Sequence, residues 1–163
     1  MQIILNAAYF LNPTRLESSA SVNSEMGWFP KNSTKYSPVA HEFGHYLSFI
    51  AMLKHYNGDS VLIIDESTEY LLYDLARDFK VGEFSYKMIE EAYENYKKDH
   101  PTNLSLDEWR SQISTYAMAK DDSGNYIYDE TIAEAFHDVY LNKNNAALPS
   151  IYIVNVLKSR LKG

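Results

Sequence analysis

The 163-residue chain contains no cysteine, so disulfide bonds and cysteine-ligated zinc sites are excluded. It has no run of apolar residues as long as a membrane span and no cluster of lysine and arginine, and its net charge is −7. A polyanionic phosphate backbone would be repelled by such a chain. We therefore expect neither a membrane partner nor a nucleic-acid partner.

The first ten residues lack the basic segment and the cleavage site of a signal peptide. The localisation therefore stays unknown at this stage, and the chain could be a domain excised from a longer protein.

Apolar residues make up 45% of the chain and aromatic residues 14%, including 14 tyrosines. This composition is sufficient for one packed core, and the length fits one domain. We expect a single domain over residues 1–163 and a monomer.

The hydrophobic pattern predicts a mainly helical chain of the α+β class with a small N-terminal sheet. Residues 2–10 are apolar and precede Asn12-Pro13, which is typical of a strand that ends in a turn. Residues 17–37 are rich in serine and asparagine and predict a long loop, anchored by Trp28-Phe29-Pro30. Residues 61–64 suggest a short strand or a lead into a helix. Helices are predicted at about 37–57, 66–80, 85–99, 105–119, 129–141 and 149–161, with a polar loop at 121–128.

The helix predicted at 37–57 contains the residues with the clearest chemistry. Ser37 is a suitable N-cap, Pro38 suits the first helical position, and Gly58 is a stop signal. Apolar residues cover most faces of this segment, which is typical of a buried central helix. Its polar residues at 41, 42 and 45 therefore need an explanation, since buried polar groups must have partners.

His41-Glu42-Phe43-Gly44-His45 is an H-E-x-x-H sequence. Two histidines four positions apart lie on one helical face and can bind one zinc ion, while Glu42 can act as general base on a zinc-activated water. The alternative is a solvated helix face that carries the pattern by accident. The apolar surroundings favour the metal site, and Gly44 suggests a close approach by another segment.

A catalytic zinc requires a third protein ligand and one open position. Glu130 and Glu134 lie one turn apart in the predicted helix 129–141. The first is the predicted ligand, and the second is predicted to accept the free N–H of a ligating histidine. In the alternative assignment Glu134 binds the metal and Glu130 only caps the helix. Either assignment gives one Zn²⁺ per chain.

Three motifs together resemble a known family: H-E-F-G-H at 41–45, I-S-T-Y-A at 113–117 and E-T-I-A-E-A-F at 130–136. The chain looks like the gluzincin metallopeptidases related to anthrax lethal factor and Pro-Pro endopeptidase, and like zincin domains beside phage minor head proteins and toxin domains. The resemblance implies a zincin-like fold and a bacterial or phage origin. It also implies the ligands His41, His45 and Glu130, the base Glu42, the supporting acid Glu134 and a catalytic Tyr116.

This chain departs from that family's pattern between the tyrosine and the third ligand. The segment 121–129 lengthens the gap and introduces Tyr126 and Tyr128, which are alternatives to Tyr116 as the residue that assists catalysis. Tyr116 also shares a helical face with Trp109 and Ile113, so a core position is the competing interpretation.

The expected function is that of a zinc-dependent endopeptidase acting on a peptide or protein substrate. The rival interpretation is a non-catalytic or self-processing zinc-binding module of a phage or toxin assembly. The remaining histidines, His55, His100 and His137, are predicted at the surface or at helix ends, with His137 the least secure because it follows Glu134 within one turn.

Overall fold

The computed structural model describes residues 12–57 and 69–162 of the chain. Their elements are α2 (Pro13–Glu25), α3 (Ser37–Asn57), α4 (Glu69–Val81), α5 (Glu83–Asp99), α6 (Leu106–Arg110), η1 (Tyr116–Met118), α7 (Tyr128–Asn142), η2 (Lys143–Asn145) and α8 (Leu148–Lys162).

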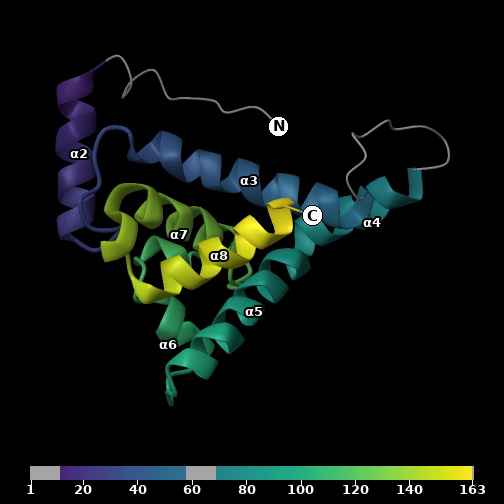
Figure 1. Ribbon diagram of the computed structural model, residues 1–163. Helices are drawn as coiled ribbons and strands as arrows, with labels where there is room; N and C mark the ends of the chain where they lie inside the picture. The colour runs from purple at the N-terminus through teal and green to yellow at the C-terminus, as the bar shows by residue number, and fades with distance from the viewer. Residues whose placement is uncertain (1–11, 58–68, 163) are drawn as a thin grey trace.

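The long helix α3 runs along one side of the molecule, and α7 and α8 lie against it (Figure 1). Helix α5 packs on α8 and α7 from the other side, and α2 stands beside the N-terminal end of α3. The core between these helices contains the fully buried side chains of Trp109, Ile132, Ile153 and Leu157. Because α7 contacts α3, α5 and α8, its inward-facing side chains are held between several neighbouring helices.

The predicted α+β class with a small N-terminal sheet is wrong. No sheet forms within residues 12–57 and 69–162, where the only β-type pairing is an isolated antiparallel bridge between Lys120 and Tyr126. The faces of α3 and α7 that carry the core are covered by other helices, and the described part of the chain is helical apart from this bridge and the connecting loops. The strand predicted at 2–10 and the segment 61–64 lie outside the described residues.

The serine-rich segment after residue 12 is helical up to Glu25, where the sequence predicted a loop. Asn12 is the N-cap, and its side-chain oxygen accepts a hydrogen bond from the backbone N–H of Arg15 at 3.1 Å. Asn-Pro therefore starts a helix here. Only Leu16 and Ala20 of α2 are buried, which explains why the hydrophobic pattern was too weak to predict the helix.

The helix predicted at 105–119 begins as expected but ends early. Ser105 and Glu108 form the predicted capping box. Helix α6 ends at Arg110, and the chain then turns through Ser114, whose hydroxyl accepts a hydrogen bond from the backbone N–H of Ala117 at 3.1 Å. This local bond competes with helix continuation and directs the segment toward α7.

Helix α3 has the predicted ends but is not buried on every face. Phe43 and Tyr46 are exposed and stack on each other, and Phe43 also contacts Phe136 of α7. The apolar character of α3 therefore serves two surfaces, the core and an exposed aromatic row.

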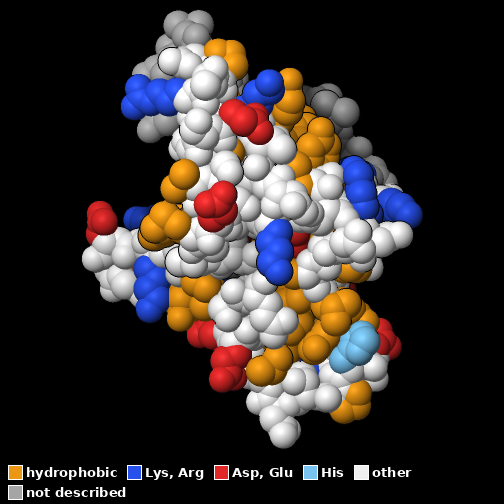
Figure 2. All heavy atoms as spheres, turned by 90° about the vertical axis from the view of Figure 1, so that its left-hand side faces the viewer, with side chains coloured by type: hydrophobic (Ala, Val, Ile, Leu, Met, Phe, Trp, Pro, Cys, Tyr) orange, Lys and Arg blue, Asp and Glu red, His pale blue; other side chains and the backbone are white. Residues whose placement is uncertain are grey.

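The surface of the molecule carries charged and apolar side chains side by side (Figure 2). Figure 2 shows one face on which acidic, basic and apolar side chains are intermixed, with no continuous basic stripe across it. Among the described helices, none combines the length and the apolar content needed to span a lipid bilayer.

Candidate metal centre

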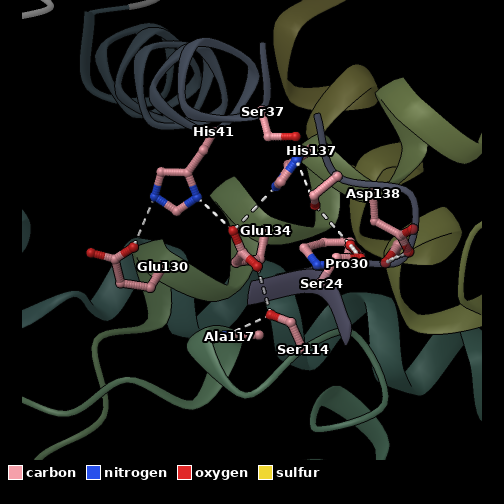
Figure 3. Close-up of polar contacts among 12 residues, drawn as sticks. Ser24, Pro30, Ser37, His41, Ser114, Ala117, Glu130, Glu134, His137 and Asp138 are labelled. Carbon is pink, nitrogen blue, oxygen red and sulfur yellow. Dashed lines mark hydrogen bonds and ion pairs between the residues drawn. The ribbon is translucent and has the colours of Figure 1, made fainter. Parts of the chain in front are cut away.

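The candidate site lies where α3 and α7 are in closest contact. His41 projects from α3 toward Glu130 and Glu134 of α7 (Figure 3). His45, one turn further along α3, also lies beside Glu130. The close approach predicted from Gly44 is confirmed: a Cβ atom added there would lie 2.7 Å from Ala133 Cα and 3.0 Å from Ala133 O. A glycine on α3 thus allows the backbone of α7 to come near enough for the histidines and carboxylates to meet.

We expect Gly44→Ala to destabilise the protein, because the added methyl group meets backbone atoms that cannot move aside. Overpacking of this kind costs about 1–3 kcal/mol, which outweighs or matches the roughly 1 kcal/mol that alanine gains over glycine in a helix. The helices should separate and metal affinity should fall. Denaturant unfolding with and without zinc measures both effects, and Val39→Ala on the exposed face of α3 is the control. Unchanged unfolding and unchanged affinity would contradict this account of Gly44.

Three potential ligand atoms converge in a small triangle. The Nε2 atoms of His41 and His45 lie 3.0 Å apart, and Glu130 Oε2 lies 3.1 Å from the first and 3.3 Å from the second. Bonds of 2.0–2.1 Å to a tetrahedral zinc ion would separate its ligands by about 3.3 Å. The described residues therefore place these three atoms close to the spacing that such an ion requires.

The opposite nitrogen of each imidazole is held by a carboxylate. His41 Nδ1 lies 2.7 Å from Glu134 Oε1, and His45 Nδ1 lies 2.5 Å from Asp129 Oδ2. A carboxylate at Nδ1 fixes the proton on that nitrogen, so that in the neutral ring the lone pair is on Nε2. Both lone pairs then face each other and Glu130, an arrangement that needs either extra protons or a cation to be stable.

Glu130 Oε2 is the atom that best tests for a metal. It is buried and has no hydrogen bond of acceptable geometry, so its partners are the two Nε2 atoms at ion-pair distance, although buried carboxylate oxygens are normally hydrogen-bonded. The side chains around it are only partly enclosed, with 12% of His41, 17% of His45 and 16% of Glu130 exposed. A cation bound at this point would satisfy the oxygen and remain reachable from outside.

In the metal-free site the neighbouring charged side chains shift the pKa values of the candidate ligands. Burial lowers the pKa of His41, but the carboxylates of Glu130 and Glu134 outweigh it and raise this pKa to about 9. His45 is likewise disfavoured by burial as a cation, while Asp129 and Glu130 raise its pKa to about 10. Burial raises the pKa of Glu130, and the two imidazoles overcome this and lower it to about 2. The site is therefore built to hold positive charge.

Glu134 has a different environment from Glu130. Its side chain is fully buried, accepts a 2.6 Å hydrogen bond from the Ser114 hydroxyl, and contacts His41 and His137 (Figure 3). Burial raises its pKa, but bonds to His137 and His41 lower it below the usual value. Ser114 of the I-S-T-Y-A motif is thus the residue that orients Glu134, a role that sequence reasoning missed.

Two sets of residues in the described part of the chain could hold a metal ion: His41, His45 and Glu130, and His41, Glu134 and His137. In the second set Glu134 and His137 are 0% and 1% exposed, and Glu134 already pairs with His41 Nδ1 at 2.7 Å. The first set has the open side that a catalytic site needs.

His137 is buried, so its prediction as a surface residue is wrong, whereas His55 and His100 are exposed.

Asp129 is the other functional candidate that sequence reasoning missed. Besides His45 it accepts a 2.6 Å hydrogen bond from the Ser48 hydroxyl, one turn further along α3 than His45. One sequence feature could have indicated Asp129 as a candidate: it directly precedes Glu130 in the first turn of α7, where the helix dipole favours carboxylates.

Glu42 is exposed on α3 and lies between two clefts. The large cleft has a volume of about 950 Å³ and is lined by His45, Glu130, the end of α4 and residues of the segment 121–128. The small cleft has a volume of about 400 Å³ and is lined by His41, Tyr116, Trp28 and Phe29. Glu42 lines both, so a chain that passes from one cleft to the other must pass this carboxylate.

The three candidate tyrosines have different surroundings. Tyr116 lies with its ring centroid 5.5 Å from that of His41, and burial together with nearby Glu130, Glu134 and Glu42 raises its pKa. The rings of Tyr126 and Tyr128 instead lie 4.0 and 4.8 Å from the guanidinium carbon of Arg110. Tyr116 is therefore the tyrosine that borders the histidine pair.

Comparison of the chain with models of protein families, with curated protein sequences and with solved structures gives no match.

Proposed function

We propose that this protein is a zinc-dependent endopeptidase whose ion is bound by His41, His45 and Glu130. The observation that carries the proposal is the triangle formed by two Nε2 atoms and the buried Glu130 Oε2, which lacks a hydrogen bond. Two clefts, both lined by Glu42, border this triangle. Two imidazoles and one carboxylate with an open side are typical of catalytic zinc.

When bound, zinc supplies a Lewis acid that polarises a carbonyl and lowers the pKa of water. Glu42 accepts the proton of the attacking water on its carboxylate and returns it to the departing amine. Glu134 and Asp129 retain the Nδ1 protons and thereby direct both Nε2 lone pairs to the ion. The Tyr116 hydroxyl, kept protonated by its raised pKa, donates a hydrogen bond to the developing oxyanion.

The rival proposal, a non-catalytic zinc module, would need neither an exposed carboxylate beside the ligands nor an open cleft on each side of it. Both features are present at Glu42, and they favour catalysis. Self-processing is a special case of the same chemistry, in which the substrate is the parent polypeptide.

We expect one zinc ion per chain and a stabilisation by zinc that grows with pH. In the metal-free protein the raised pKa values of His41 and His45 stabilise the fold fully below about pH 6.5, and this contribution is lost as the pH rises through 9 and 10. The lowered pKa of Glu130 contributes stability to the fold above about pH 4.5, and this contribution is lost as the pH falls through 2. Zinc replaces those protons, so its binding strengthens as they dissociate.

Elemental analysis and thermal unfolding with chelator or with zinc, between about pH 5 and about pH 8.5, measure this. The difference in Tm between the two samples should widen as the pH rises. His55→Ala, which removes an exposed histidine outside the site, should leave that difference unchanged. If the protein bound no zinc at neutral pH, even with zinc added, this result would contradict the proposed function.

A further inference from the structure

The segment between η1 and α7 forms a small β-hairpin over residues 119–127. Lys120 and Tyr126 pair in antiparallel fashion, flanked by backbone hydrogen bonds from Asp121 N to Asn125 O and from Ile127 N to Ala119 O, both 2.9 Å. In this arrangement Lys120 and Tyr126 are a non-hydrogen-bonded pair. The N–H and C=O groups of each therefore point outward, away from the partner strand.

One edge of this hairpin faces the large cleft. The cleft lining includes Gly124, Asn125, Tyr126 and Ile127, together with Glu42, His45 and Glu130, and it does not include Lys120. Since Tyr126 and both of its neighbours line the cleft whereas Lys120 does not, we infer that the outward main-chain groups of Tyr126 belong to the edge nearer the cleft. Tyr126 presents one donor and one acceptor, the pair by which an extended chain joins a strand edge.

The hairpin is held firmly and is connected to the metal ligands. Asp121 accepts hydrogen bonds from the backbone N–H groups of Asn125 and Ser123 at 2.8 and 2.9 Å. The buried Arg110 lies under the ring of Tyr126 and donates to the Thr131 hydroxyl at 2.9 Å. Since the Glu130 N–H bonds the Ile127 carbonyl at 3.1 Å, a chain paired with this edge has a fixed register relative to Glu130.

We propose that the Tyr126 edge of the hairpin binds the substrate of the proposed peptidase, an extended polypeptide segment that adds to it as a strand along the large cleft. This inference rests on the proposed function, because it takes the bound segment to be the substrate of the peptidase. The assignment of the hairpin edge as the element that binds the segment is additional. The cleft is also lined by Asp78, Asp121 and Asp129 against Lys80. The bound segment is therefore one without acidic side chains.

Two proline substitutions test the pairing directly, because proline removes one N–H and is tolerated at strand edges. They are made in zinc-loaded Glu42→Gln protein, which binds substrate without cleaving it. Tyr126→Pro removes the donor that faces the cleft, and Tyr126→Ala loses the same ring but keeps the donor. Lys120→Pro removes the outward donor on the opposite edge, and Ala119 before it already has the extended backbone (φ −55°, ψ 146°) that a following proline requires.

The probe is a mixture of fluorescently labelled, unstructured peptides without aspartate or glutamate, with affinity measured by anisotropy and folding by circular dichroism. We expect Tyr126→Pro to bind at least about tenfold more weakly than Tyr126→Ala, which equals about 1.4 kcal/mol. Lys120→Pro should bind as Lys120→Ala does, since both changes remove the Lys120 ammonium that lies 4.5 Å from the Tyr126 ring centroid. Equal binding by Tyr126→Pro and Tyr126→Ala, or no binding of these peptides by folded, zinc-loaded protein, overturns the proposal. Zinc content and peptide hydrolysis by the parent protein, which retains Glu42, test the proposed function separately.

Discussion

Replacing Glu42 with glutamine is expected to abolish measurable peptide hydrolysis while the fold and the zinc content stay unchanged. The carboxylate lies at the junction of the two clefts and is exposed, so its loss removes a proton acceptor without disturbing the core. General acid–base catalysis contributes about 10²–10⁴-fold to a rate. We therefore expect kcat/KM to fall by at least about a hundredfold, with no shift of the Tm in either the zinc-loaded or the metal-free state.

The matched control is Asp122→Asn, which removes one negative charge from an exposed position on the hairpin outside the cleft lining. This variant should cleave at the parent rate. If Glu42→Gln cleaved as fast as the parent, Glu42 could not be the base. If it lost zinc as well as activity, the carboxylate would have to act on the ion itself.

Removing the carboxylate of Glu130 is expected to cost far more zinc affinity than removing that of Glu134. Glu130 supplies the buried oxygen that lacks a hydrogen bond, whereas Glu134 holds the Nδ1 proton of His41 from a fully buried position. Loss of an outer partner typically lowers affinity or activity about 10–100-fold. Glu134→Gln should fall within that range, and Glu130→Gln should abolish tight binding.

Competitive zinc titrations with a chromogenic chelator rank the two variants. Ser114→Ala provides a milder comparison, because Ser114 donates to the second oxygen of Glu134 and does not approach the ion. Ser114→Ala should lower the zinc affinity, as Glu134→Gln does, but by a smaller factor. A larger loss in Glu134→Gln than in Glu130→Gln would exchange the two roles and would favour the set formed by His41, Glu134 and His137.

Local sequence signals predicted the parts of this site that depend on spacing within one helix. His41 and His45 are one turn apart on α3, Glu130 and Glu134 are one turn apart on α7, and Gly44 predicted a close helix contact. The partners that orient these groups were not predictable in the same way. Ser114 and Asp129 owe their roles to how α7 lies against η1 and α3, and no periodicity in the sequence encodes that distance.

The fold was predictable to a similar degree. The capping box at Ser105, the start of α3 at Ser37 and the helical assignments of α4, α5, α7 and α8 follow from caps and hydrophobic spacing. The sheet was a wrong inference from a short apolar segment, a pattern that strands share with buried helices. Helix α2 was missed because it buries few side chains, and the hairpin because a single bridge leaves no alternating pattern.

The contact between α3 and α7 joins residues that are distant in the chain: 84 positions separate His45 from Asp129, and 93 separate His41 from Glu134. In a chain without cysteine, an ion shared by these helices would act as a cross-link that closes a loop containing α4, α5, α6 and the hairpin. By the chain-entropy description, closing a loop of about 100 residues removes about 4–5 kcal/mol of freedom from the unfolded ensemble. A bound ion would then restrict the segment between α3 and α7. The time course of metal uptake during refolding would show when these two helices come into contact.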